Sequence, residues 1–256
     1  MSTFLWHRKI FFLYIMAAIL PLLGGCSAWN SVTSMFSSPP PEEMKVTGTD
    51  ADMTREAMEF FNTGRYMMAE EIFQKIRDRY PFSPYATVAE LRLADCKYYR
   101  DFYLEALPLY ENFEQLHPTN DAIPYVIYQE GACYYEMMDT PDRDQSNTLK
   151  MIDTYRRLLT RFPESPFSYE AKKRIKEGTD LLAEHEYVVA EWYSRVDRPA
   201  CAVNRLERLI MLYPDASIRP EAEELLASQK AIMVINSEEA KILPDTEPWY
   251  RKLWPF

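Results

Sequence analysis

A short motif that marks the end of a helix recurs four times in this sequence, and it constrains the fold more than any other feature. In each copy an aromatic or leucine side chain is followed by proline and then by a polar turn; the prolines are Pro81, Pro118, Pro163 and Pro214. Proline cannot continue a helix interior, so four helices are predicted to end in the same way. Successive prolines lie 37, 45 and 51 residues apart.

Small and aromatic residues recur at matching distances before three of these prolines. The first spacing is close to the period of about 34 residues that is typical of tetratricopeptide repeats. In such repeats the small residues let two helices approach closely, and the aromatic side chains fill the space between helix pairs. Three repeats fit this pattern, with Ala57, Phe60, Ala69, Phe73 and Ile76 in the first, Leu93, Ala94, Ala106, Tyr110 and Phe113 in the second, and Val189, Ala190, Tyr193, Ala202, Leu206 and Leu209 in the fourth.

The third repeat fits only if it carries an insertion at about residues 136–150, which contains the polar segment Asp139–Asp144. The proline-free stretch Tyr169–Tyr193 predicts one long helix, and a last helix is expected over Pro220–Val234. We therefore predict an all-α fold, a right-handed superhelical array of tetratricopeptide-type helix pairs over residues 51–235. The array contains about five repeats, and the fifth is either complete or partial.

The first 25 residues have the composition of an export signal. A basic pair, Arg8 and Lys9, precedes an apolar run that closes with Leu23-Gly24-Gly25 in front of Cys26. The run is shorter than the roughly 20 residues that span a bilayer as a helix, which favours a signal peptide over a retained transmembrane anchor. Leu-Gly-Gly-Cys resembles a bacterial lipobox. That resemblance implies lipidation of Cys26 as the first mature residue; the alternative is an incidental cysteine.

Residues 26–50 are rich in Ser, Thr, Pro and Gly and predict a lipidated, flexible tether. Two or more acyl chains on one residue anchor a protein firmly to a membrane. In the sorting scheme that the lipobox resemblance implies, an aspartate after the cysteine favours the inner membrane, and this sequence has Ser27 there. We therefore expect attachment to the periplasmic face of the outer membrane, through the lipid alone.

The charge balance argues against a nucleic-acid partner. The chain has 39 acidic and 29 basic residues, with a formal net charge of −10. An acidic protein gains nothing from the release of counterions by a phosphate backbone. The acidic surface either keeps the protein soluble or attracts a basic partner.

Motifs of catalysis and cofactor binding, such as Gly-x-Ser-x-Gly, His-Glu-x-x-His and the P-loop, do not occur in the sequence. We expect a binding protein and not an enzyme, without a cofactor or metal site. Cys96, Cys133 and Cys201 each occupy a helical position where a small apolar residue is expected. Buried free thiols are favoured there over a disulfide, although an exported protein can form one.

Aromatic and polar side chains are predicted to line the inner face of the first helices in the early repeats. Tyrosine packs in repeat cores with its hydroxyl at the rim, so these rings either fill inter-helix space or form a groove for an extended peptide or a partner helix. The predicted groove residues are Phe61, Asn62, Asp95, Tyr98, Tyr99, Tyr125, Tyr128 and Tyr135.

Four stretches taken together are similar to the BamD family of outer-membrane assembly lipoproteins. They are RYPFSPYA at 79–86, HPTNDAIPYVIYQEG at 117–131, DRD at 142–144, and EYVVAEWYSRVDRPACAVNRLERLIMLYPDA at 186–216. The resemblance implies a member of the complex that inserts β-barrel proteins into the outer membrane (the BAM complex). Its implied partners are the POTRA domains of a BamA-like barrel, unfolded outer-membrane proteins bound by the N-terminal repeats, and other assembly lipoproteins.

The same resemblance assigns the contact with the POTRA domains to the C-terminal repeats. Arg205 matches a family arginine linked to that contact, and Asn204, Glu186 and Tyr187 are placed with it as partner-binding residues. We expect the Arg205 guanidinium to be free to pair with a partner carboxylate. The alternative is an ordinary arginine on a helix surface.

The C-terminal segment 236–256 departs from the family pattern, because it is short, aromatic and interrupted by Pro244 and Pro248. It is expected either to fold back onto the array or to dock on a partner. The alternative function is that of a repeat lipoprotein that tethers peptidoglycan enzymes or another envelope-spanning complex.

Overall fold

The computed structural model describes residues 49–242, with side chains to residue 238. This part of the chain is all-α, as predicted, and contains no strand. Its helices are α3 (Asp50–Asn62), α4 (Tyr66–Arg79), α5 (Pro84–Tyr98), α6 (Tyr103–Leu116), α7 (Ile123–Glu136), α8 (Ser146–Arg161), α9 (Ser168–Arg195), α10 (Pro199–Leu212) and α11 (Arg219–Ile242). The predicted signal peptide, Cys26 and the aromatic residues after Ile242 lie outside the described residues.

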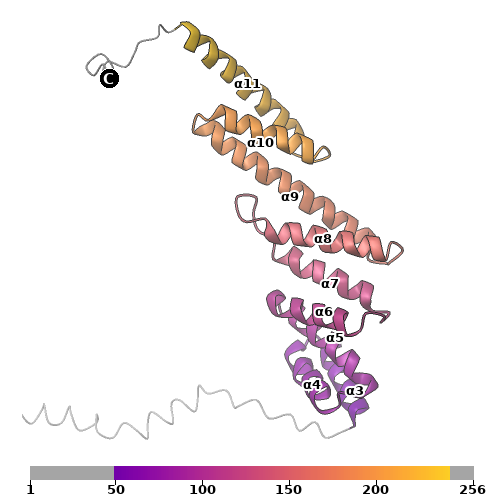
Figure 1. Cartoon of the computed structure of the whole chain (residues 1–256). Coiled ribbons are helices and arrows are strands. Elements are labelled where there is room, and N and C mark those ends of the chain that lie inside the picture. Colours follow the sequence, from indigo (N-terminus) through magenta and orange to yellow (C-terminus); the bar gives the residue numbers. More distant parts are fainter. Residues whose placement is uncertain (1–48, 243–256) are drawn as a thin grey trace, which may run out of the picture. The chain divides into compact units, whose positions relative to one another are not determined.

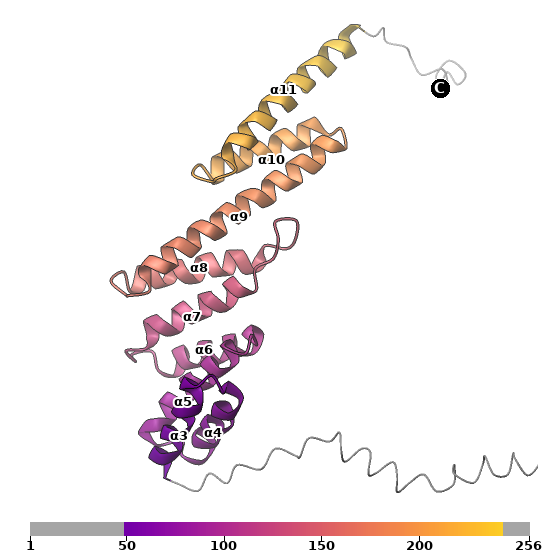
Figure 2. The ribbon, with the colours of Figure 1, turned by 180° about the vertical axis from the view of Figure 1, so that it is seen from behind.

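Each helix packs mainly against the next one along the chain, so the helices form a repeat array (Figures 1 and 2). Contacts that skip a helix join α3 to α5 and α9 to α11. Within residues 49–242, no helix combines the length and apolar character needed to cross a bilayer.

The four repeated prolines mark the ends of the second helices, as the sequence predicts. The residue before each proline has left the helical region, with φ/ψ of −128°/51° at Tyr80, −126°/52° at His117, −138°/63° at Phe162 and −127°/61° at Tyr213. A residue before proline avoids the α conformation because the proline ring collides with it. Four helices therefore end with nearly the same backbone geometry.

The turns inside the helix pairs repeat as well. Three described residues have positive φ, namely Gly64 at 76°, Asp101 at 63° and Asp197 at 55°. Each lies 17 residues before the proline that ends its repeat. Glycine and aspartate adopt this left-handed conformation at lower cost than most residues. The third repeat has the loop 137–145 in this place, which agrees with the predicted insertion.

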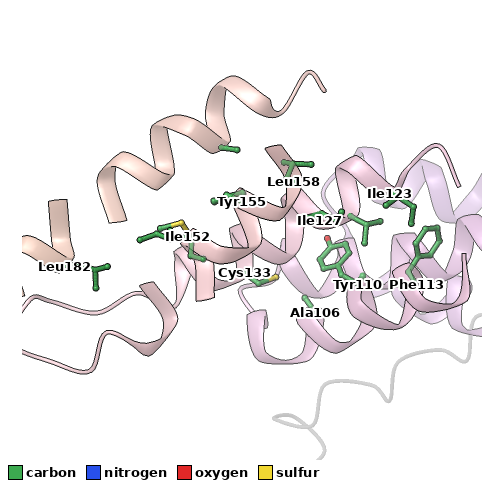
Figure 3. Close-up of a cluster of buried hydrophobic side chains, with 14 residues drawn as sticks. Ala106, Tyr110, Phe113, Ile123, Ile127, Cys133, Ile152, Tyr155, Leu158 and Leu182 are labelled. Atoms are coloured by element: carbon green, nitrogen blue, oxygen red, sulfur yellow. The ribbon is translucent and has the colours of Figure 1, made fainter. Parts of the chain in front are cut away.

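Most of the small and aromatic positions read from the sequence lie in the core, whereas Phe60, Val189 and Tyr193 are only partly buried. A continuous cluster of buried side chains runs from α5 to α9, with Tyr110, Phe113 and Tyr155 as its largest members (Figure 3). Gly131 is required by this packing, because a Cβ atom there would lie 2.5 Å from Cε1 of Tyr155. A larger residue at this position would displace the buried ring.

The C-terminal helices differ from the prediction at one boundary. The predicted long helix is α9, but α11 continues to Ile242, beyond residue 235 where we expected the array to end. The added segment, Asn236–Ile242, has no glycine or proline and contains good helix formers, so nothing local ends it. Among the described residues α11 follows four helix pairs, and it supplies the first helix of a fifth.

Candidate binding surfaces

Aromatic side chains from the first two repeats form one connected cluster. The ring of Tyr99, the residue that follows α5, stacks on Tyr66 at a centroid distance of 5.0 Å and contacts Phe61 edge to face at 5.7 Å. Tyr98 contacts Tyr99 at 5.5 Å and Tyr103 at 5.4 Å. Edge-to-face and offset contacts of this kind stabilise aromatic pairs beyond their buried area. We call these five residues the first aromatic cluster.

The first aromatic cluster is joined to the core through Asp95. We predicted that Asp95 lines the groove, but its side chain is fully buried between α5, α6 and α7. Its Oδ1 accepts hydrogen bonds from the hydroxyls of Tyr110 at 2.7 Å and Tyr125 at 2.8 Å, and Arg92 donates to Oδ2 at 2.6 Å. The predicted position was wrong because the buried tyrosine hydroxyls need an acceptor in the core.

Burial raises the pKa of the Asp95 carboxyl, while the hydrogen bonds from Tyr110 and Tyr125 and the charge of Arg92 oppose that rise. The Arg92 guanidinium also lies 5.1 Å from the centre of the Phe61 ring. A buried carboxylate therefore fixes the position of a guanidinium that supports a surface ring. Asp95 itself is inaccessible to solvent.

A second aromatic cluster surrounds Arg174 of α9. Tyr128 stacks on Phe167 at 4.9 Å, and Tyr125 contacts Phe167 at 5.7 Å. The Arg174 guanidinium lies 4.5 Å from the ring centre of Tyr135 and 5.4 Å from that of Tyr128. Cation–π contacts of this kind are strongest over electron-rich rings that are partly shielded from water.

The structure brings together most of the predicted groove residues but gives them unequal access to solvent. Tyr99 is 46% exposed and Asn62 is also exposed, whereas Tyr98 and Tyr128 pack against the hydrophobic core. Burial raises the pKa of Tyr98 to about 12. Some of these rings therefore fill inter-helix space and others are open to solvent, and a groove for a peptide stays a prediction.

Sequence reasoning missed four members of the two clusters: Tyr66, Tyr103, Phe167 and Arg174. Tyr66 and Tyr103 could have been found, because each lies 15 residues before the proline of its repeat. Phe167 directly precedes α9, and Arg174 lies in α9. Positions counted back from the repeated prolines do not reach these two residues. Their contacts depend on how α9 packs against α7 and α8.

The predicted partner-binding residues lie on α9 and α10. Glu186 of α9 is buried and accepts a hydrogen bond from Nη1 of Arg205 at 2.9 Å. Its second oxygen lies 3.6 Å from Nε of Arg208. Asn204 is exposed, and Tyr187 is partly buried with a pKa that burial raises.

The Arg205 guanidinium is therefore not wholly free, and its pairing with a partner carboxylate stays a prediction. Arg205 lies on α10 opposite a buried carboxylate of α9, and burial of that carboxylate requires a paired cation. The Arg205 side chain remains 34% exposed. Part of its guanidinium is thus committed to the fold, and part still faces solvent.

The described cysteines are free thiols, and Cys96 and Cys133 are buried as predicted. Burial raises both thiol pKa values to about 12, which suppresses thiolate chemistry. Cys201 is exposed, contrary to our expectation, because it lies in the first turn of α10 on the side opposite Leu206. Within residues 49–238, no group of three or more acidic, histidine or cysteine side chains is arranged to hold a metal ion.

The helical array is similar in sequence to known proteins. The model of the YfiO family, described as outer membrane lipoprotein, matches residues 47–242. The outer membrane protein assembly factor BamD of Vibrio cholerae is 27% identical over 80% of this chain and 85% of its own length. The protein of the same name from Rickettsia prowazekii is 26% identical over 86% of this chain and 83% of its own length.

Solved structures align less closely. The TPR2AB domain of yeast Sti1 in its pHSP90 complex is 16% identical, covers 70% of this chain and 71% of its own, and has a TM-score of 0.42. A tetratricopeptide repeat protein from Parabacteroides merdae is 15% identical, covers 77% and 68%, and has a TM-score of 0.37. The family match, in contrast, spans the whole described array. The chain belongs to the YfiO family of outer membrane lipoproteins.

Proposed function

We propose that this chain is a non-catalytic scaffold of the outer-membrane protein assembly (BAM) complex. The observation that carries this proposal is the family match over residues 47–242, together with relatives named as outer membrane protein assembly factor BamD. In this proposal the chain is anchored by lipid at Cys26 on the periplasmic face of the outer membrane. It binds unfolded outer-membrane proteins and the POTRA domains of a BamA-like barrel.

The proposed substrate surface consists of Phe61, Asn62, Tyr66 and Tyr99, with the second aromatic cluster beside it. A strand of an outer-membrane barrel alternates apolar and polar residues and carries aromatic residues near the membrane interfaces. When such a strand is unfolded, its backbone groups are unpaired and its rings are exposed to water. The exposed ring of Tyr99 can pack against the rings of such a peptide, and the exposed Asn62 can form hydrogen bonds with its backbone.

The proposed surface for the POTRA domains is centred on Arg205. A guanidinium has five N–H donors, and only Nη1 of Arg205 is used by Glu186. Glu186 therefore orients the side chain and leaves other donors for a carboxylate of the partner. A guanidinium that is already held in place loses less entropy on binding than a mobile one.

The test is to purify the full-length lipidated chain from the envelope in mild detergent and to identify the proteins that accompany it. We expect a BamA-like barrel with the wild type and its loss with Arg205→Ala. The matched control is Arg208→Ala, which alters the other arginine near Glu186 and should retain the barrel. Circular dichroism checks that both variants are folded.

Absence of a BamA-like barrel from the wild-type preparation would overturn the proposal. Recovery of peptidoglycan enzymes in its place would favour the alternative scaffold. Retention of the barrel by folded Arg205→Ala would remove Arg205 from the contact while leaving the assembly role intact.

A further inference from the structure

A cavity of about 530 Å³ opens between α6, α7 and α8, and neither proposed surface includes it. Its volume lies in the range of roughly 300 to 1,000 Å³ that is common for ligand sites. Four of its lining side chains are acidic and one is basic; the lining consists of Glu111, Glu114, Gln115, Glu130, Tyr134, Asp153, Thr154 and Arg157.

The cavity lies on the opposite side of α7 from the second aromatic cluster. Glu130 follows Tyr128 by two residues, which corresponds to a rotation of roughly 200° around a helix of 3.6 residues per turn. Tyr134 lies one turn after Glu130 on the same side of the helix. A ligand in this cavity would therefore leave the rings of Tyr128 and Tyr135 accessible.

Glu130 supplies the independent sign of a ligand. It is only 3% exposed, yet its Oε1 atom has no hydrogen-bond partner. Its Oε2 accepts a hydrogen bond from Nη2 of Arg157, whose Nη1 donates to Glu114 at 2.6 Å. A buried carboxylate oxygen without a donor is costly, so a cationic donor that reached this atom from the cavity would offset that cost.

The existing pairing indicates which cation fits. Arg157 already bridges Glu114 and Glu130, so the cavity accepts a guanidinium between carboxylates. With every group charged, the four acidic side chains exceed Arg157 and Arg161, which also pairs with Glu114, by two negative charges. A planar guanidinium can bond two carboxylates at once, as Arg157 does with Glu114 and Glu130.

We propose that this cavity binds an arginine side chain of an extended peptide or partner segment, with Glu130 Oε1 as the acceptor at its base and Glu111 and Asp153 at its rim. The arginine would come to lie beside Arg157, and the surplus of carboxylates offsets the repulsion between the two cations. The site gives the array a recognition surface for basic segments that is separate from the aromatic face.

The experiment uses the purified full-length chain in detergent and two probes, acetyl-Gly-Arg-Gly-amide and the uncharged analogue with citrulline in place of arginine. Ligand-observed NMR measures both dissociation constants. We expect the arginine peptide to bind at least tenfold more tightly than the citrulline peptide. We expect Glu130→Gln to weaken the arginine peptide about tenfold.

Two further variants separate the cavity from the acidic surface in general. Glu111→Gln changes the rim without touching the core, so it tests the site if Glu130→Gln does not fold; we expect a loss of about threefold. Glu164→Gln removes one acidic charge from the turn before α9, outside the cavity, and should leave the affinity unchanged.

Equal binding of the two peptides would overturn the proposal, as would equal losses in Glu164→Gln and the cavity variants. Displacement of the arginine peptide by stoichiometric calcium at matched ionic strength would also overturn it, in favour of a metal site. None of these results depends on recovery of a barrel protein, so failure of this proposal is distinguishable from failure of the assembly role.

Discussion

The core of the second and third repeats and the core around α10 are built from the same type of helix pair but from different side chains. Between α5 and α9 the largest buried residues are Tyr110, Phe113 and Tyr155. The buried cluster of α9–α11 consists of alanine and leucine, namely Ala183, Ala190, Leu206, Leu209, Ala216 and Ala222. One pattern of helix packing thus accommodates two different core compositions.

The two core compositions require different pairing of their buried polar groups. A buried tyrosine must satisfy its hydroxyl, so the N-terminal core contains Asp95 and its donors. An aliphatic core makes no such demand, and the buried carboxylate of α9, Glu186, is paired with arginines that still reach solvent. Hydrogen bonds from the core between α5 and α9 therefore fix the nearby surface, while the paired charges of α9 and α10 remain partly open to solvent.

The largest expected effect separates the two cores directly. Tyr155→Ala removes a fully buried ring, and we expect a loss of about 3 to 5 kcal/mol in the free energy of unfolding. Leu206→Ala removes a smaller buried side chain, and we expect about 2 to 3 kcal/mol. Urea denaturation measures both values.

Hydrogen exchange then shows where the structure opens. Each repeat of such an array contacts mainly its neighbours, so destabilisation should stay local. Faster exchange in α7 and α8, but not in α11, is expected for Tyr155→Ala. Uniform acceleration along the whole array would contradict the division into two cores.

A smaller effect is expected for the two buried carboxylates. Asp95→Asn weakens three hydrogen bonds at once, one of them from a guanidinium, so we expect a loss of about 2 kcal/mol. Glu186→Gln keeps an acceptor for one arginine, and we expect about 1 kcal/mol. Thermal unfolding measures the loss of stability in each variant. A larger loss in Glu186→Gln than in Asp95→Asn would contradict the expected order.

The third expected effect is a dependence of stability on pH, and it arises at Glu130 in the region between α5 and α9. Burial raises the pKa of Glu130 from 4.5 to about 7, and nearby Glu114 and Glu111 add to the rise that Arg157 opposes. The folded protein therefore holds this proton more tightly than the unfolded chain. The resulting stability is full below pH 4.5 and is lost as the pH rises through about 7.

Glu130→Gln cannot titrate at this position, so it is the matched reference. Relative to this variant, the free energy of unfolding of the wild type should fall by on the order of 2 to 3 kcal/mol between pH 5 and pH 8. Urea titrations at both pH values measure the difference. Parallel pH dependence in the two proteins would show that Glu130 titrates normally.

Much of the fold could be predicted because the proline motif and the small residues are local signals. Four helix ends, the buried alanines and the insertion of the third repeat follow from backbone sterics and spacing alone. The end of α11 was misplaced because helix formers continue past residue 235 until the chain approaches Pro244. A boundary without a strong stop signal is the least predictable part of a helix.

The candidate sites were less predictable because pairing across helices is not visible in spacing. Asp95 was read as a surface residue and Arg205 as free, yet both have partners that only tertiary packing provides. The cavity beside Glu130 was not predicted, since its acidic side chains come from three helices. Charges that meet between helices are separated by long and irregular stretches of sequence.

In the proposed function, substrate binding and partner binding occupy separate parts of the array. The most direct test of this separation is to measure two properties in Tyr99→Ala and Arg205→Ala: affinity for an unfolded barrel-strand peptide and recovery of a BamA-like barrel from the envelope. Tyr99 is exposed, so its truncation should cost little stability and weaken the peptide about tenfold while the barrel is retained. Arg205→Ala should lose the barrel and keep the peptide. Equal loss of both properties in either folded variant would contradict the account.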